Sequence, residues 1–261
     1  IERLRARGDE LLILSRHKDI TCQVLDDMGL AHKPVSRAGK GAVGLARELL
    51  ARDWAVLREA RRFRPDVMIG FGGLAISHVG RLLGLPSVSF YDTEEATLQN
   101  RLTWPFISHL YVPECYDGPL PERRTTRLAG VKPLSHLHPE HFAPDREIAL
   151  ASGLDPGRDN FLLRVVSWEA NHDLGLTGWS ERHLRALVEF LSARGKVHLS
   201  SESPLPADLA ALGYAGKPTD ILHLMGHCRL YLGESATMST EAAILGVSNI
   251  FNSDVHRSYV K

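Results

Sequence analysis

The sequence predicts an α/β protein with two Rossmann-like parallel-sheet domains and a cleft between them. Three observations predict this fold class. Short apolar runs alternate with longer amphipathic segments, an order typical of parallel strands joined by helices. Seven of the 14 prolines lie between residues 113 and 160, where the alternation stops and then resumes. A motif of the first half also returns in the second half.

The first half opens on the end of a helix, because Ile1 and Leu4 are apolar and Gly8 provides a C-terminal cap. We expect one further strand and half a helix upstream of Ile1. Glycines and prolines then mark the boundaries of the elements that follow. We expect strands over Leu11–Ser15, Val67–Gly70, Ser87–Tyr91 and Leu110–Val112, and helices over Asp19–Met28, Ala42–Arg62, His78–Leu83 and Leu98–Ile107.

The second half repeats this organisation after the proline-rich stretch. We expect strands over Phe161–Val166, Lys196–Ser200, Arg229–Leu232 and Val247–Phe251, and helices over Glu181–Ala193, Asp220–His227 and Thr237–Leu245. Residues 80–88 and 242–250 resemble each other, since in both a helix ends at Leu-Gly and a strand begins two residues later. We therefore predict domains over residues 1–143 and 144–261.

Composition and charge exclude several classes of protein. Lys and Arg number 31, as do Asp and Glu, so the chain lacks the basic excess expected of a nucleic-acid-binding protein. The three cysteines form no CxxC pair, which argues against a disulfide framework and a thiolate zinc site. No apolar run approaches the length of a membrane span, and the first residues lack the apolar core of a signal peptide. We expect a cytoplasmic protein.

The segment Leu230–Gly246 carries the strongest chemical signal. A predicted strand ends at Gly233, and small or hydroxyl residues open the following helix. Backbone N–H groups at a helix start, together with the helix dipole, suit a phosphate or diphosphate. Glu241 falls about one turn into the helix, where its carboxylate would accept hydrogen bonds from ribose hydroxyls. The alternative is a well-capped helix with a solvated Glu241.

A glycine-rich turn, Gly70–Gly73, follows the strand after Pro65. Glycines allow a sharp turn and close approach to a ligand, but the segment is neither a GxGxxG fingerprint nor a P-loop. A purely structural turn is an equal alternative. His78 is expected at the start of the next helix, as a catalytic group or as a cap or packing residue.

Acidic residues follow the strand Ser87–Tyr91. Asp92, Glu94 and Glu95 come directly after its carboxyl end, which is where open α/β sheets bind ligands. A carboxylate there would act as a general base on a hydroxyl. The alternative is an acidic helix start that complements the helix dipole, and we expect Glu95 to be solvated.

The segment Arg164–Gly175 is the first strand and loop of the second domain. Arg164 lies among apolar strand residues and needs a partner, either a carboxylate in a salt bridge or a ligand phosphate. His172 and Asp173 follow in the loop, where they would touch a leaving diphosphate.

Two weaker features complete the survey. His136, His138 and His141 cluster, but no cysteine lies nearby in sequence, and we expect no metal site. Residues 40–64 carry seven basic and three acidic side chains together with Trp54 and Leu57. This stretch would suit an anionic membrane surface or a lipid-linked acceptor, and a solvated helix face is the alternative.

In order and spacing these segments resemble the GT-B glycosyltransferases. Residues 39–100 resemble the acceptor domain of the peptidoglycan N-acetylglucosamine transferases, and residues 233–246 resemble their donor domain. Across residues 39–251 the chain is more similar still to the uncharacterised DUF354 family. It departs from the usual pattern at Ser248, where proline is common, and in the loop over residues 167–175, which is not glycine-rich.

The resemblance implies transfer of a sugar from a nucleotide diphosphate, UDP in the first instance, to a glycan or lipid-linked glycan during surface-polysaccharide synthesis. It implies no metal and no cofactor beyond the nucleotide-sugar donor. The residues implied for donor binding are Gly233, Ser235, Ala236, Thr237, Met238, Glu241, Arg164 and His172. Those implied for catalysis are Asp92, Glu94 and His78. A nucleotide-sugar 2-epimerase of the same fold and a non-catalytic nucleotide- or glycan-binding subunit are the alternatives.

Overall fold

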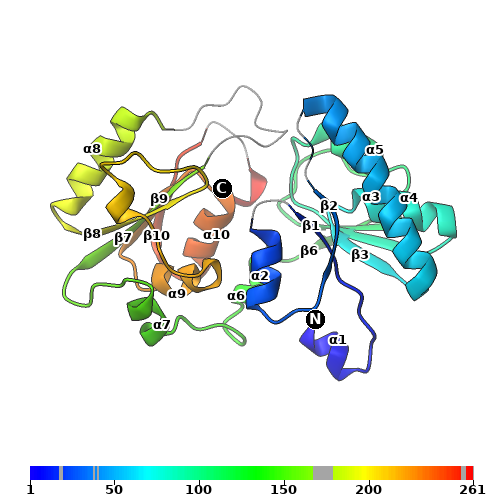
Figure 1. The fold of residues 1–261 in the computed structure, drawn as a ribbon, viewed down its shortest axis with the longest axis horizontal. Helices are drawn as coiled ribbons and strands as arrows, with labels where there is room; N and C mark the ends of the chain where they lie inside the picture. Colours follow the sequence, from blue (N-terminus) through cyan, green and yellow to red (C-terminus); the bar gives the residue numbers. More distant parts are fainter. Residues whose placement is uncertain (18–19, 38, 40, 167–178, 254–256, 261) are drawn as a thin grey trace. The chain divides into compact units, whose positions relative to one another are not determined.

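A computed structural model describes residues 1–17, 20–37, 39, 41–166, 179–253 and 257–260. The chain divides into two compact units (Figure 1). The first unit contains residues 1–91, 97–112 and 119–127. The second contains residues 92–96, 113–118 and 128–261, so two short segments from the first half of the chain belong to it.

The first unit contains two sheets. β1 (Leu14–His17) and β2 (Lys33–Arg37) pair in parallel, and β3 (Met68–Phe71), β4 (Ser87–Phe90), β5 (His109–Pro113) and β6 (Thr125–Leu128) form a second sheet in that order. The pairs β3–β4 and β4–β5 are parallel. The helices are α1 (Glu2–Ala6), α2 (Thr21–Asp27), α3 (Gly41–Phe63), α4 (Leu74–Leu83), α5 (Thr97–Thr103) and the 3-10 turn η1 (Glu122–Arg124).

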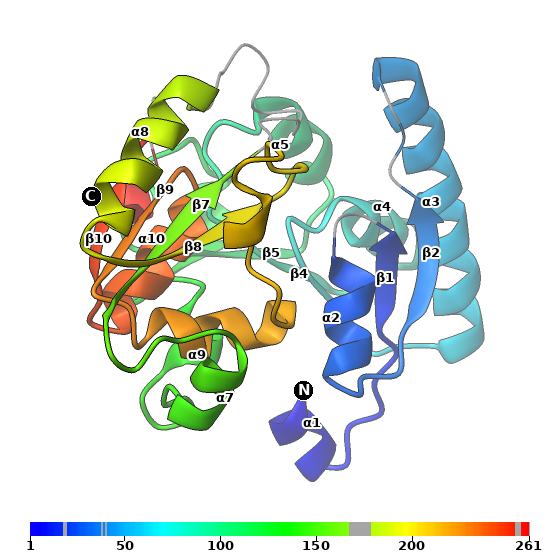
Figure 2. The ribbon, with the colours of Figure 1, turned by 60° about the vertical axis from the view of Figure 1, so that its left-hand side comes forward.

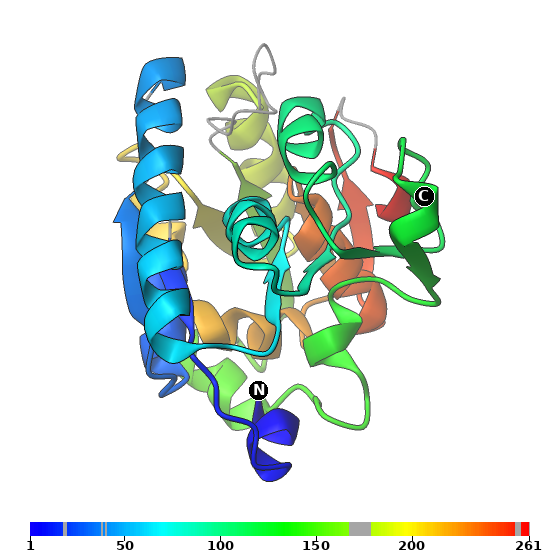
Figure 3. The same ribbon diagram turned by 90° about the vertical axis from the view of Figure 1, so that its right-hand side faces the viewer.

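The core of the first unit forms where α3 and α4 pack against the strands. Val56, Leu57 and Ala60 of α3 are buried with Met68 of β3 and Val79 of α4. Figure 3 shows the long α3, drawn from blue to cyan. In the same helix Leu50 and Trp54 are 71% and 66% exposed.

The second unit has one parallel sheet in the order β10–β9–β7–β8. Its strands are β7 (Asp159–Val165), β8 (Gly195–Ser201), β9 (Leu230–Gly233) and β10 (Ser248–Phe251). Its helices are α6 (Leu134–Leu137), α7 (Arg146–Ala151), α8 (Glu181–Ser192), α9 (Ile221–Met225) and α10 (Ala236–Ile244), and its 3-10 turns are η2 (Ala210–Leu212), η3 (Pro218–Asp220) and η4 (Ser258–Val260).

Both faces of this sheet are covered, as expected of a parallel sheet. Alternate residues of β7 point to opposite faces, since Leu163 packs with α8 and Leu162 packs with α7, α9 and α10. Figure 2 shows these helices around the sheet. The parallel sheets of the two units confirm the α/β fold class predicted from the sequence. The cleft between the domains and the boundary at residue 143 stay predictions.

Several elements differ from the expectations. The first strand begins at Leu14 instead of Leu11, and β2 was not predicted, because its sequence Lys-Pro-Val-Ser-Arg has no apolar run. α4 begins at Leu74, so the prediction that His78 starts this helix is wrong. The proline-rich stretch is also more ordered than a plain linker, since η1, β6, α6 and α7 lie within it.

A buried histidine in the second unit makes the stability of the fold depend on pH. His198 of β8 is 5% exposed, and its Nε2 donates to Oδ1 of Asn160 at 3.0 Å. Burial, and secondarily the charge of Lys196, lowers the pKa of His198 from 6.5 to about 4. The native state therefore keeps this ring neutral at pH values where the unfolded chain protonates it.

We predict that the free energy of unfolding falls as pH drops from 6.5 to 4, by up to about 3 kcal/mol from this residue. In the His198→Gln variant, which keeps a donor for Asn160, this part of the pH dependence disappears. Urea unfolding of both proteins at a series of pH values measures the difference. Parallel curves for the two proteins between pH 7 and pH 4 would show that His198 is not responsible.

Candidate functional site

The start of α10 is built around a close contact between two strands. An added Cβ on Gly233 would lie 2.8 Å from Cβ of Arg164 and 2.6 Å from the hydroxyl of Tyr231, so only glycine fits at the end of β9. Ser235 follows as the N-cap, and its Oγ accepts the N–H of Met238 at 3.4 Å.

The first turn of α10 has the features of an anion site. Ala236 and Thr237 are its first two residues and are only partly buried. N–H groups at the first positions of a helix have no intrahelical partner and carry the positive end of the dipole. Ser235, Ala236, Thr237 and Met238 therefore lie together where the sequence places a diphosphate.

Glu241 lies one and a half turns further along α10. Its side chain is 11% exposed, and Oε1 lies 3.3 Å from Nε2 of His136 on α6. The alternative of a solvated Glu241 is therefore wrong. His136, one of the three clustered histidines of the sequence, thus has a carboxylate partner that lies 105 positions away in the chain.

The acidic segment after β4 belongs to the second unit. Oε1 of Glu94 accepts a hydrogen bond from Oγ of Ser258, and Glu95 forms an ion pair with Arg257. Glu95 is thus not simply solvated. Tyr259, the next residue of η4, lies near the side chain of Thr237, because η4 packs against α10. The acidic segment and the first turn of α10 are therefore joined through the three consecutive residues Arg257, Ser258 and Tyr259.

Asp92 and Glu94 differ in what surrounds them. Asp92 is 6% exposed, and Oγ1 of Thr93 donates to its Oδ1 at 3.2 Å. Burial raises the pKa of Asp92, and the charge of Lys132 partly opposes this rise. A raised pKa makes a carboxylate a stronger base once it is ionised. In Glu94 the second oxygen, Oε2, is buried without a hydrogen-bond partner among the described residues.

The guanidinium group of Arg164 forms hydrogen bonds with two side chains of the protein. Its Nη2 donates to Oε1 of Glu202 at 2.6 Å, and its Nη1 donates to Oγ of Ser200 at 2.7 Å. This is the salt bridge that the sequence left open as an alternative to a ligand phosphate. Nε of Arg164 remains buried without a hydrogen-bond partner in the described part of the chain.

Sequence reasoning missed Glu234, the residue between the strand and the N-cap. Its side chain is buried, Oε2 accepts the N–H of Val166 at 3.1 Å, and Oε1 accepts the N–H of Trp179 at 2.5 Å. One carboxylate thus holds both ends of the segment over residues 167–178. His172 and Asp173 lie in that segment, outside the described residues.

His78 belongs to a different place in the fold. Its Nδ1 lies 2.7 Å from Oδ2 of Asp53 on α3, and its Nε2 lies 2.9 Å from the carbonyl oxygen of Leu102 on α5. Its ring also stacks edge-on against Phe106. Both ring nitrogens have partners inside the first unit, and the ring packs against Phe106, as in a packing residue.

The glycine-rich turn has a structural requirement of its own. Gly72 and Gly73 have φ values of 74° and 55°. A Cβ on Gly73 would lie 2.9 Å from Oγ of Ser89, and one on Gly72 would lie 2.8 Å from Nε2 of Gln99. These contacts explain both glycines without a ligand.

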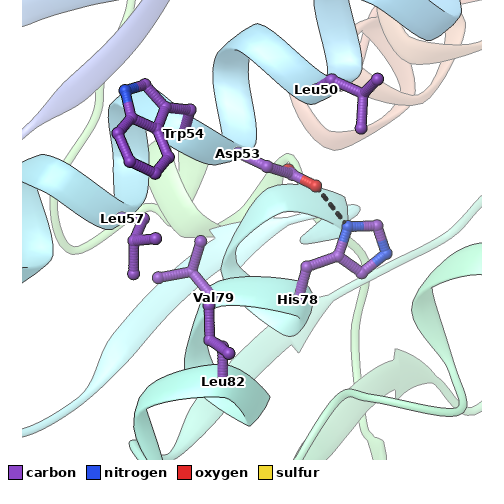
Figure 4. A pocket seen from close by; sticks show the side chains of 7 residues that line it. All are labelled: Leu50, Asp53, Trp54, Leu57, His78, Val79 and Leu82. Carbon is purple, nitrogen blue, oxygen red and sulfur yellow. Dashed lines mark hydrogen bonds and ion pairs between the residues drawn. The ribbon is translucent and has the colours of Figure 1, made fainter.

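An apolar pocket of about 240 Å³ lies between α3 and α4 of the first unit (Figure 4). It is lined by Leu50, Asp53, Trp54, Leu57, His78, Val79 and Leu82. Leu50, Trp54 and Leu82 are 66–71% exposed, so they form an apolar patch around the pocket. Across the described residues, no helix is both long and apolar enough to cross a bilayer, and no cluster of three metal-binding side chains occurs.

Comparison with known proteins gives partial matches in sequence. No family model matches the chain, so the resemblance to DUF354 stays a prediction. The UDP-N-acetylglucosamine–N-acetylmuramyl-(pentapeptide) pyrophosphoryl-undecaprenol N-acetylglucosamine transferase of Paracidovorax citrulli is 31% identical over 110 residues. The transferase of the same name from Verminephrobacter eiseniae is 34% identical over 111 residues. Each match covers 39% of this chain and only 31% of the relative's length.

Solved structures match nearly the whole chain in fold. A putative UDP-N-acetylglucosamine 2-epimerase from Listeria monocytogenes matches with a TM-score of 0.64 and 12% identity, over 97% of this chain and 74% of that one. MurG of Acinetobacter baumannii matches with a TM-score of 0.55 and 14% identity, over 99% and 75%.

A third structure is the 2-epimerase of Methanocaldococcus jannaschii in complex with UDP-GlcNAc and UDP. It matches with a TM-score of 0.59 and 15% identity, over 96% of this chain and 78% of that one. At these identities the likeness concerns the fold. The chain therefore has the α/β fold, with a parallel sheet in each unit, that GT-B glycosyltransferases and UDP-GlcNAc 2-epimerases share.

Proposed function

We propose that this protein binds a UDP-sugar and transfers the sugar to a hydroxyl group of a glycan or lipid-linked glycan. The first turn of α10 carries the proposal, because its N–H groups and the hydroxyls of Ser235 and Thr237 suit a diphosphate. The matches to N-acetylglucosamine transferases and to a 2-epimerase in complex with UDP-GlcNAc and UDP support UDP as the nucleotide.

In this proposal Glu241 binds the ribose and His136 fixes its carboxylate. A buried carboxylate with one oxygen on a histidine keeps further acceptor positions for two neighbouring hydroxyl groups. Asp92, whose pKa is raised by burial, is the base that would remove the proton from the acceptor hydroxyl. Arg164 and His172 are proposed to stabilise charge on the leaving diphosphate, with Arg164 retaining its bond to Glu202.

We predict that Glu241→Ala weakens UDP binding at least about tenfold, since hydrogen bonds to charged groups contribute about 1.5–3 kcal/mol. Isothermal titration calorimetry with UDP measures the affinity. Glu189→Ala, which removes an exposed glutamate from α8, is the matched control and should bind UDP like the unmodified protein. Equal affinities for the Glu241 and Glu189 variants would contradict the assignment of the ribose site.

A 2-epimerase is the second candidate, because the epimerases of L. monocytogenes and M. jannaschii match with TM-scores of 0.64 and 0.59. The two reactions differ in one requirement: a transferase needs an acceptor, and an epimerase converts UDP-N-acetylglucosamine alone.

We expect proton NMR of the protein with UDP-N-acetylglucosamine alone to show no second epimer. Product should appear only when a glycan or lipid-linked acceptor is added. Formation of the epimer without an acceptor would contradict the transferase proposal and favour the epimerase. Binding of UDP without turnover across a panel of acceptors would favour a non-catalytic binding subunit.

We also propose that the patch of Leu50, Trp54 and Leu82 contacts an anionic membrane surface. The acidic residues of α3 are used inside the unit: Glu48 pairs with Arg16, Asp53 with His78 and Glu59 with Lys33. Several basic side chains of the helix are left exposed at its surface, namely Arg47, Arg58, Arg61 and Arg62. Exposed apolar side chains next to basic ones are typical of an interfacial helix.

We predict that Leu50→Ser combined with Trp54→Ser weakens binding to vesicles of phosphatidylethanolamine and phosphatidylglycerol at least about tenfold, through loss of buried apolar area. Co-sedimentation with the vesicles measures it. Leu98→Ser in α5 is the control, because Leu98 is 70% exposed and lies outside the patch. The same loss in the control, or no binding by the unmodified protein, would contradict a role of the patch.

A further inference from the structure

The turn η4 is a fixed part of the second unit. Ser258 is 4% exposed, and its hydroxyl donates to Glu94, a residue 164 positions earlier in the chain. Arg257, the residue before this turn, forms an ion pair with Glu95, and its side chain is 10% exposed. Two neighbouring carboxylates thus hold two neighbouring residues at the start of this turn.

This anchoring places Tyr259 at the first turn of α10. The turn η4 packs against α10, and Tyr259 lies near the side chain of Thr237, the second residue of the helix. Figure 1 shows η4, drawn in red, beside α10. A ligand that accepts hydrogen bonds from the first N–H groups of α10 would therefore lie beside the phenol of Tyr259.

The charges around this phenol keep its proton in place. Burial, followed by the negative charge of Asp92, raises the pKa of Tyr259 to about 12, with Glu94 adding to the rise and Arg257 opposing it. The hydroxyl therefore remains a neutral hydrogen-bond donor at neutral pH. A neutral phenol can donate a hydrogen bond to a phosphate that lies close to carboxylates. An ionised phenolate could not donate and would add a further negative charge.

We propose that Tyr259 donates a hydrogen bond to the diphosphate of the nucleotide and that Glu94 and Glu95 are positioning residues that hold it there. This inference rests on the function proposed above and adds a contact to the same site. In this arrangement Glu94 acts through the hydroxyl of Ser258, and Asp92 remains as the base.

Titration calorimetry with UDP tests the contact. Tyr259→Phe removes one hydroxyl and should weaken UDP binding about tenfold, the loss expected for a hydrogen bond to a charged group. Tyr214→Phe is the matched control, because the hydroxyl of Tyr214 donates to the carbonyl oxygen of Lys217 in the same unit. Its affinity for UDP should stay within about twofold of the unmodified protein. Phosphorus NMR should show shifted signals of bound UDP for Tyr259→Phe only.

Three further variants test the positioning role. Glu94→Ala and Ser258→Ala both break the anchor and should weaken UDP binding about as much as Tyr259→Phe. Glu94→Gln keeps an oxygen that accepts the hydroxyl of Ser258 and should restore the affinity. If Glu94 were instead a base, Glu94→Gln would lower turnover as much as Glu94→Ala does, and this result would overturn the positioning role.

The possible outcomes separate the two levels of the proposal. If the unmodified protein binds UDP and Tyr259→Phe binds it equally well, with unchanged phosphorus signals, the contact is wrong and the proposed function stands. If the unmodified protein does not bind UDP at all, both are wrong.

Discussion

The second unit depends on the contact between Gly233 and Arg164. A side chain at position 233 would collide with Arg164 and Tyr231. The last residue of β9 must therefore be glycine for β9 to pair with β7 at that point. This pairing decides where the chain leaves the sheet. Glu234 then lies next to the ends of β7 and β9, and Ser235 can begin α10 directly beyond the sheet edge. The position of the helix start, and of any anion it holds, follows from one missing Cβ.

The net charge of the chain is zero, but its acidic and basic side chains are distributed differently between the interior and the surface. In α3 the carboxylates point inward to Arg16, His78 and Lys33, while most of the arginines stay at the surface. In the second unit four glutamates form hydrogen bonds or ion pairs with other residues of the unit, namely Glu94, Glu95, Glu234 and Glu241. Neutral composition thus coexists with a basic helix surface and with buried acidic groups.

The sequence predicts the elements whose ends carry local signals. α8 and α10 begin at the serine caps Ser180 and Ser235, and their apolar spacing or small residues mark their length. β2 escapes prediction because Lys33, Pro34 and Arg37 are exposed at a sheet edge, where neither apolar alternation nor a central run is needed. Local signals therefore suffice for α8 and α10 but fail for the short polar strand β2 and for the start of α4.

The candidate site is predicted only in part, for the same reason. The motif around Ser235 and Thr237 is continuous in sequence, so its chemistry can be read there. The partners of Glu241 and Glu94 lie 105 and 164 positions away, and a sequence contains no local signal for such contacts. Arg164 was predicted only in part. Its apolar neighbours indicated that it needs a partner, but they did not indicate whether that partner is Glu202 or a phosphate.

The two bonds of Glu234 have an evolutionary consequence. Both join its carboxylate to main-chain N–H groups, of Val166 and Trp179, and neither depends on the identity of a side chain. Descendants of this chain could exchange residues between these two points and keep the same entry and exit. Substitutions at Val166 or Trp179 themselves would likewise leave both main-chain bonds of Glu234 in place.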